Sequence, residues 1–111
     1  MNTIIAKIQN KDSDEAIYMK AAQILKNGGL VAFPTETVYG LGANALDEMA
    51  SAKIYAAKRR PSDNPLIVHI ADVADLDKLA VGIDDRVKKV AVAFWPGPLT
   101  MILRKKQCIP D

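Results

Sequence analysis

The feature that most constrains the fold is the run LIVHI at residues 66–70, which lies between Pro65 and Asp72. A nearly continuous apolar run of this length is typical of a strand that is buried on both faces. A strand of that kind needs helices on both sides of its sheet. The run therefore favours an α/β sheet that is covered by helices.

The rest of the chain alternates between strand-like and helix-like segments. Further strands are predicted at 3–8, 30–33 and 99–104, and helices at 13–27, 47–57, 73–80 and 84–94. In the first helix Asp12 or Ser13 can serve as the N-cap, and Gly28 suits a left-handed stop. Its apolar stripe has spacings of three and four residues and consists of Ile17, Ala21, Ile24 and Leu25.

Two of the later helices also have a predicted inward face. The second begins at Asp47 as N-cap and ends before Pro61, because a proline disfavours helical geometry in the residue before it. Its inward positions are Ala50, Ile54 and Ala57. The inward positions of the last helix are Val87, Val90, Ala91 and Phe94. In the turn FWPGP that follows, Trp95 is expected to anchor the core.

Composition narrows the class of protein. Fifteen Lys and Arg residues against 13 Asp and Glu give a net charge of +2, so overall charge gives no reason to expect nonspecific nucleic-acid binding. No apolar run approaches the ~18 residues of a membrane span, and the N-terminus has no signal-peptide pattern. The single cysteine, Cys108, excludes an intrachain disulfide and a multi-cysteine zinc site. We therefore expect one folded domain with a cytoplasmic location.

A loop rich in hydroxyl groups and glycines follows the strand predicted at 30–33. It has the sequence PTETVYGLGAN at residues 34–44, and loops after buried strands are common ligand sites in α/β proteins. The letters GLGANA formally match a dinucleotide-binding fingerprint. That match is weak, because TETVY precedes the first glycine and the next helix begins later. The glycines are more simply explained by tight turns.

The cations of the segment KRRPSDNP, residues 58–65, have two interpretations. Cations at the end of a helix interact favourably with its dipole and are usually solvated. Alternatively, an extended backbone over 58–60 would point Lys58 and Arg60 to the same side. Their Cα atoms would then be ~6–7 Å apart, which suits neighbouring phosphates.

His69 is the only histidine, and a lone histidine in a strand is more often a hydrogen-bonded core residue than a functional one. The sequence has no HExxH motif, cysteine pair or EF-hand loop, so a metal site built from protein side chains alone is not expected. It also lacks the GxSxG motif of a nucleophile elbow.

Three segments in order, PTETVYGLGANA, AKRRPSDNPLIVHI and FWPGPLTMIL, closely resemble the YrdC-like family of threonylcarbamoyl-adenylate synthases. The resemblance covers nearly the whole chain and is sharpest from residue 28 onward. It implies an open twisted α/β sheet with helices around a large concave cavity. It also implies conversion of L-threonine, bicarbonate and ATP to threonylcarbamoyl-AMP and pyrophosphate. The product supplies the threonylcarbamoyl group of a modified adenosine in tRNA.

The resemblance also implies which residues form the site. Catalysis and ATP binding fall on Lys58 and Arg60, with Asn64 in the same ATP-binding loop, and threonine binding falls on Thr35, Thr37 and His69. The implied cofactor is Mg²⁺ held through the ATP phosphates, and the implied partner is a downstream threonylcarbamoyl transferase complex. Residues 1–111 are expected to be one catalytic domain that is incomplete at its C-terminus, because the family's later S-x-N element is absent.

Two alternatives stay open. The first is a noncatalytic RNA-binding or ribosome-assembly module of the same fold, whose surface could extend over Lys88, Lys89, Arg104, Lys105 and Lys106. The second is the related carbamoyltransferase of hydrogenase maturation. That enzyme takes carbamoyl phosphate, and its usual zinc-finger and acylphosphatase segments are not found in this sequence.

Overall fold

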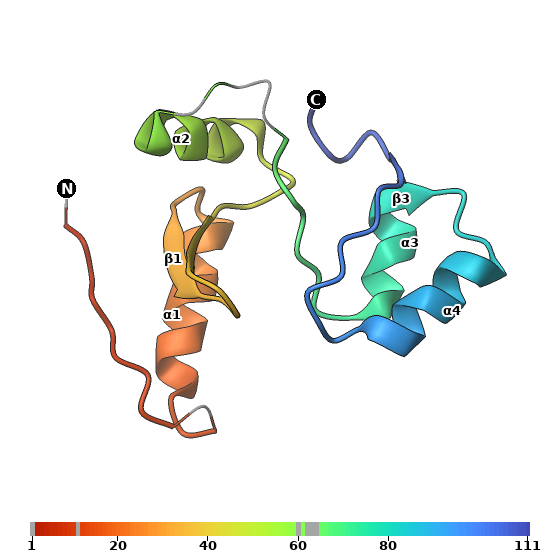
Figure 1. The fold of residues 1–111 in the computed structure, drawn as a ribbon. Helices are drawn as coiled ribbons and strands as arrows, with labels where there is room; N and C mark the ends of the chain where they lie inside the picture. Colours follow the sequence, from red (N-terminus) through yellow and green to blue (C-terminus); the bar gives the residue numbers. More distant parts are fainter. Residues whose placement is uncertain (1, 11, 60, 62–64) are drawn as a thin grey trace.

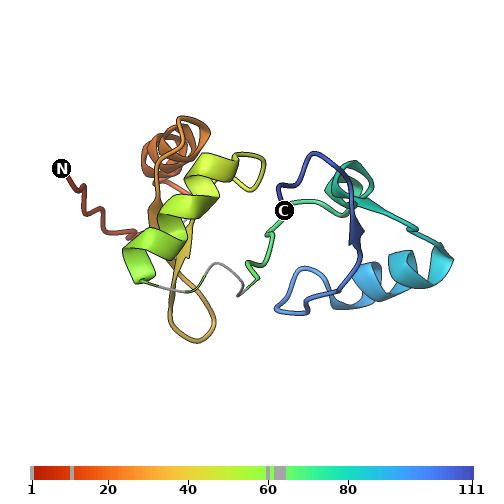
Figure 2. The ribbon, with the colours of Figure 1, turned by 90° about the horizontal axis from the view of Figure 1, so that it is seen from above.

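A computed structural model describes residues 2–10, 12–59, 61 and 65–111. Its elements, in chain order, are α1 (Glu15–Lys26), β1 (Val31–Pro34), β2 (Tyr39–Gly42), α2 (Glu48–Lys58), the 3₁₀ helix η1 (Val73–Asp75), α3 (Leu76–Leu79), β3 (Ala80–Val81), α4 (Asp85–Phe94) and β4 (Arg104–Lys105). Figures 1 and 2 show two groups of elements in both views. We call α1 to α2 the N-terminal half, η1 to β4 the C-terminal half, and residues 65–72 the connecting segment.

The N-terminal half is built on an antiparallel hairpin. Strands β1 and β2 pair from Val31 opposite Gly42 to Pro34 opposite Tyr39, and α1 packs against β1. Helix α1 ends where Gly28 adopts a φ of +82°, a left-handed conformation that glycine enters without a Cβ penalty. Helix α2 begins at the predicted N-cap, because the Asp47 carboxylate accepts hydrogen bonds from two backbone N–H groups of its first turn.

The C-terminal half is a set of short elements joined by capped turns. Strands β3 and β4 pair over two residues each, with Ala80 opposite Lys105. The carboxylate of Asp72 caps η1, and that of Asp84 accepts a 3.0 Å hydrogen bond from the Val87 N–H at the start of α4. Aspartate at these positions satisfies N–H groups that have no partner within the helix. Short helices can therefore form here with little buried surface.

The core of the molecule is small. Among the described residues the buried apolar side chains are Ala50, Ile54, Leu76, Ala80 and Ala91. The accessible surface is 9151 Å², against about 6,000 Å² for a compact chain of 12.1 kDa. Much apolar surface therefore remains exposed, and each half has only a few buried side chains of its own.

Three predicted strands are absent, which corrects the sequence analysis. Residues 66–70 are extended, but no backbone hydrogen bond joins them to another described residue, and Ile67 is 61% exposed. Residues 3–8 form no strand, and of 99–104 only Arg104 pairs, as part of β4. An apolar pattern predicts burial, whereas a strand also needs a hydrogen-bonded neighbouring backbone, and apart from Arg104 these segments have none among the described residues. The mixed α/β class is confirmed, and the described residues form two separate two-stranded sheets.

The predicted helices are confirmed in position, but their inward faces are only partly right. Ala50 and Ile54 of α2 are buried, whereas Ala57 is exposed. In α4 only Ala91 is buried, and Phe94 is 61% exposed. Trp95 is half-buried, and its indole N–H donates to the Leu99 carbonyl at 2.8 Å. The cap of α1 is Asp14 rather than Asp12 or Ser13.

Helix α1, with 12 residues, is too short for the ~20 residues that cross a bilayer. Among the described residues no other helix has the length and apolar character of a membrane span.

Candidate functional site

The hairpin turn carries the two predicted threonines. The Thr35 hydroxyl accepts a hydrogen bond from the Val38 N–H at 3.2 Å and donates to the Val38 carbonyl, so this side chain closes the turn. The Thr37 N–H donates to the same Thr35 oxygen at 3.4 Å. Thr37 itself is exposed, and its hydroxyl has no partner among the described residues. Thr35 therefore shapes the turn, while Thr37 has the hydroxyl that is open to a ligand.

His69 lies on the connecting segment and contacts the hairpin through Phe33. The two rings meet edge to face, with centroids 5.9 Å apart and an interplanar angle of 79°. The His69 Nδ1 lies 3.3 Å from the Ile67 carbonyl oxygen. Because a carbonyl oxygen only accepts, Nδ1 is the donor in this contact, and in the neutral ring Nε2 is then the acceptor. Among the described residues no group bonds to Nε2.

Thr35 and Phe33 share one face of the hairpin. A Cβ atom placed on Gly40 would lie 3.4 Å from Cγ2 of Thr35 and 3.3 Å from Cζ of Phe33. These two side chains therefore flank Gly40 on the same face of the sheet, as expected for positions two apart on a strand. The imidazole of His69 approaches that face through Phe33. Thr35 and His69 are thus each related to the hairpin through the neighbourhood of Phe33.

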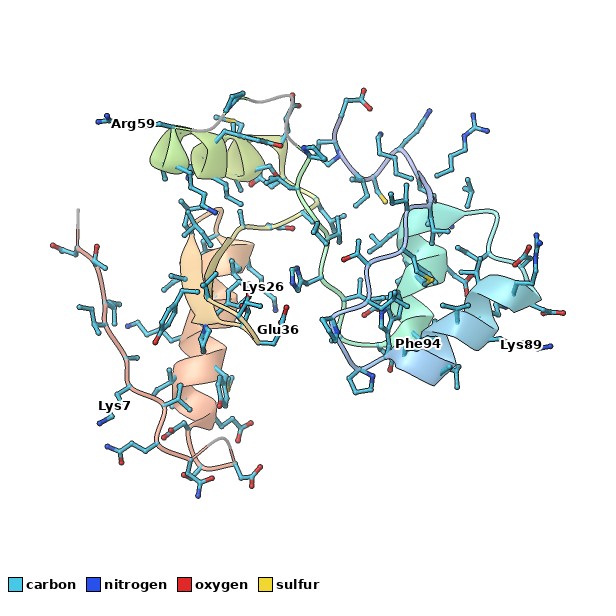
Figure 3. All side chains as sticks on the ribbon, in the orientation of Figure 1. Lys7, Lys26, Glu36, Arg59, Lys89 and Phe94 are labelled. Carbon is cyan, nitrogen blue, oxygen red and sulfur yellow. The ribbon has the colours of Figure 1, made fainter. Side chains whose placement is uncertain are left out.

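The predicted cation pair is placed differently. Lys58 is the last residue of α2, and Arg59 follows in the left-handed region with a φ of 52°. The backbone is therefore not extended at 58–59. The prediction that Lys58 and Arg60 point to the same side assumed an extended backbone over 58–60, and this assumption is wrong. Arg60 and Asn64 lie outside the described residues. Figure 3 labels Arg59 just past α2, where its side chain points away from the hairpin, and Glu36 in the hairpin turn well below it.

A hollow of about 410 Å³ lies between the two halves. It is lined by residues 44–46 after β2, by 68–71 of the connecting segment, by α3 and by Cys108. His69 is among its lining residues. The lining also includes Asp75 and Lys78, which form an ion pair at 3.1 Å, so their opposite charges cancel. The hollow is shallow and largely open to solvent. This hollow therefore offers space beside His69 without a strong bias toward anions or cations.

Sequence reasoning missed two residues that organise the N-terminal half. The Lys53 Nζ donates to the Gly28 carbonyl at 2.7 Å, which ties α2 to the end of α1. The other is Phe33, whose ring lies across the glycines of β2. A signal for Phe33 was present in the sequence, since Gly40 and Gly42 stand two apart, as positions on one face of a strand do. Nothing in the pattern around Lys53 indicated its partner.

The glycines of PTETVYGLGAN have a different role from the one expected. Gly40 and Gly42 belong to β2 rather than to a turn, and neither has a positive φ. The weak dinucleotide fingerprint also fails its structural requirement, because α2 begins only at Glu48.

Perturbed acids lie away from these residues. The pKa of Asp84 is lowered, first by the hydrogen bond from the Val87 N–H and then by the Arg86 guanidinium. The Lys105 ammonium, 2.8 Å away, lowers the pKa of Asp111. Within the described part of the chain, no three His, Cys, Asp or Glu side chains are grouped as metal ligands.

A family model assigns the chain to a protein class. The model of the Sua5/YciO/YrdC family, described as "Telomere recombination", matches residues 23–111. The chain therefore belongs to the Sua5/YciO/YrdC family, which agrees with the resemblance found in the sequence.

Particular relatives are closely similar. A protein of Pyrococcus abyssi named threonylcarbamoyl-AMP synthase is 51% identical over 97% of this chain and 32% of its own length. A Bacillus subtilis protein of the same name is 55% identical over 83% of this chain and 26% of its own length. The crystal structure of P. abyssi Sua5 complexed with L-threonine matches 97% of this chain and 32% of that structure, with a TM-score of 0.88 and 50% identity. The chain spans roughly a quarter to a third of these relatives.

Proposed function

We propose that this chain is part of the catalytic domain of a threonylcarbamoyl-AMP synthase. The observation that carries the proposal is the match to a Sua5 structure that holds L-threonine, at 50% identity over 97% of this chain. The reaction joins L-threonine, bicarbonate and ATP into threonylcarbamoyl-AMP and releases pyrophosphate. The product would serve tRNA modification in the cytoplasm through a downstream transferase complex.

The complete domain is proposed to be an open twisted sheet with helices around a concave cavity. The relatives are about three to four times longer than the part that matches here, and the described residues form two small sheets. The unpaired backbone of residues 66–70 supports this proposal, because an extended apolar segment is suited to become a strand when neighbours are supplied.

The chemistry calls for positioning and charge neutralisation. An oxygen of N-carboxy-threonine attacks the α-phosphorus of ATP, a new P–O bond forms, and the bond to pyrophosphate breaks with its electron pair. Both reactants are anions, so Lys58 and Arg60 would act by neutralising phosphate charge, with Asn64 as a hydrogen-bonding neighbour. We expect Mg²⁺ to be held mainly by phosphate oxygens and water.

The threonine side of the site rests on the hairpin and the connecting segment. The Nε2 of neutral His69 is an acceptor, and the ammonium and hydroxyl groups of L-threonine are donors. The exposed Thr37 hydroxyl can donate or accept, while Thr35 holds the turn that presents it. His69 is therefore proposed to recognise a polar group of threonine rather than to abstract a proton.

The test measures pyrophosphate release by a chimera in which residues 1–111 replace the matching part of the P. abyssi enzyme, which is 51% identical over that part. Release should require threonine, bicarbonate and ATP together. Arg60→Ala should lower it roughly a hundredfold or more, the scale of losing a charge-stabilising group. Arg59→Ala is the matched control. Arg59 is the neighbouring cation, and it is the residue in left-handed conformation that ends α2.

Unchanged release in the Arg60→Ala chimera would contradict the role of Arg60. An active chimera that ignores threonine would contradict the substrate. If the chimera instead binds RNA in a salt-sensitive manner without ATP turnover, the noncatalytic alternative would be favoured.

A further inference from the structure

We propose that Phe33 is a positioning residue that holds His69 against the hairpin, and that Gly40 and Gly42 are glycines because they make room for its ring. The expected consequence of this contact, a higher affinity for L-threonine, rests on the proposed function. The structural part of the proposal concerns only the contact between two described side chains, and it can be tested without turnover.

Phe33 lies flat against the opposite strand. Phe33 pairs with Gly40 in the register of the hairpin, and Gly42 is two residues further along β2. A Cβ atom on Gly42 would lie only 2.8 Å from Cε1 of Phe33, a separation that real Cβ atoms essentially never show. On Gly40 it would lie 3.3 Å from Cζ. A side chain at position 42 would therefore push the ring out of place.

The reason for glycine at these positions is space rather than backbone freedom. Among the described glycines only Gly28 and Gly82 have a positive φ. An aromatic ring that covers cross-strand glycines replaces the side-chain contacts that glycine cannot make. The repeated glycine thus gives a platform on which one ring lies in a defined place.

This platform matters because no backbone hydrogen bond among the described residues holds the connecting segment against the hairpin. Residues 66–70 make no backbone hydrogen bond to another described residue. The Nδ1 contact of His69 is with Ile67, only two residues away, so it orients the ring within the segment and not relative to the hairpin. The edge-to-face contact with Phe33 therefore links the imidazole to the hairpin that carries Thr35 and Thr37.

The experiment uses proton NMR of this chain, in which the ring signals of His69 are unambiguous because the chain has one histidine. Phe33→Leu should move these signals toward their positions in the urea-unfolded chain, because the ring current of the phenylalanine is lost. Phe33→Tyr should restore them. The matched control is Phe94→Leu, which removes the other phenylalanine, 61% exposed on α4, and should leave the His69 signals unchanged.

Gly42→Ala provides a second variant that keeps Phe33 but displaces its ring, so the test survives if Phe33→Leu fails to fold. It should move the His69 signals as well. Unchanged His69 signals in both variants, with folding verified by circular dichroism, would overturn the proposal.

Threonine titrations separate this proposal from the proposed function. In the chimera Phe33→Leu should raise the KM for threonine roughly three- to tenfold, the range of an aromatic pair, and leave the KM for ATP unchanged. Equal losses for both substrates would indicate a merely structural role and overturn the positioning role. A chimera that never responds to threonine, while Phe33→Leu still moves the His69 signals, would contradict the proposed function and support the contact.

Discussion

In the N-terminal half a hairpin of four residue pairs carries a long helix on its surface, whereas in the C-terminal half short helices are separated by capped turns and the strands pair over only two residues each. The predicted site residues that the structure describes lie in the first half or on the connecting segment. The second half contributes α3 and Cys108 to the wall of the hollow beside His69.

The two halves are stabilised by different kinds of interaction. The N-terminal half uses glycine and an aromatic ring to bring separate segments together, and the Thr37 hydroxyl stays open at the turn. The C-terminal half relies on aspartate caps, which stabilise local structure and need no distant partner. We therefore expect the reacting groups to lie in the N-terminal half, where long-range contacts define the geometry. The C-terminal half, which local contacts stabilise, is expected to have a structural role.

The largest expected effect tests whether the halves are independent. Leu76→Ala and Ile54→Ala each remove a side chain that is at most 7% exposed, and each should lower the free energy of unfolding of its half by about 2–3 kcal/mol. Because the most extensive packing between elements lies within each half, amide protection should fall only in the half that carries the substitution.

The measurement is residue-resolved hydrogen exchange. Ile102→Ala is the control, because Ile102 is 98% exposed and its truncation should leave protection unchanged. Loss of protection throughout the chain in either core variant would show one cooperative unit and break the comparison.

A smaller effect is expected from the caps. Asp47→Ala should lower the free energy of unfolding by about 1 kcal/mol, because the N–H groups of Met49 and Ala50 lose their acceptor. Asp14→Ala is the matched control: Asp14 makes no capping bond to α1 and instead accepts from the backbone of Gln9 and Asn10. Urea midpoints of the two variants give the comparison. A larger loss for Asp14→Ala would contradict the assignment of the caps.

How far the sequence predicted this protein depends on the range of the interaction. The cap at Asp47, the stop at Gly28 and the position of α4 were all predicted, because each depends on neighbours within a few residues. The strand predicted at 66–70 is not present. The prediction failed because an apolar pattern does not specify which backbone will pair with the segment. In the site, His69 was singled out, whereas the role of Phe33 required the register of β1 and β2.

The smallest expected effect is the pH response of α4. The hydrogen bond from the Val87 N–H, followed by the Arg86 side chain, lowers the pKa of Asp84, so the ionised carboxylate is favoured in the folded chain. Its stabilisation is present above the unfolded-state pKa of about 3.9 and is lost as the pH falls through the lower folded value. Below about pH 4 the first turn of α4 should therefore fray before the core of either half.

Hydrogen exchange at the Val87 amide against pH measures this response. Asp84→Asn keeps a capping oxygen but cannot titrate, so its profile should lack the acid step. An identical acid step in that variant would assign the fraying to another group.

The sequence by itself determined the local features of this protein: the approximate positions of the helices, the cap at Asp47, the stop at Gly28, and the family to which three motifs in order belong. These follow from interactions that span a few residues and from the chemistry of single side chains. Only the tertiary structure decided that Phe33 lies on two glycines and meets His69, that the backbone is not extended after Lys58, and that residues 66–70 lack a paired neighbour. Those outcomes depend on which distant segments come into contact, and hydrophobic patterns specify burial without specifying the partner.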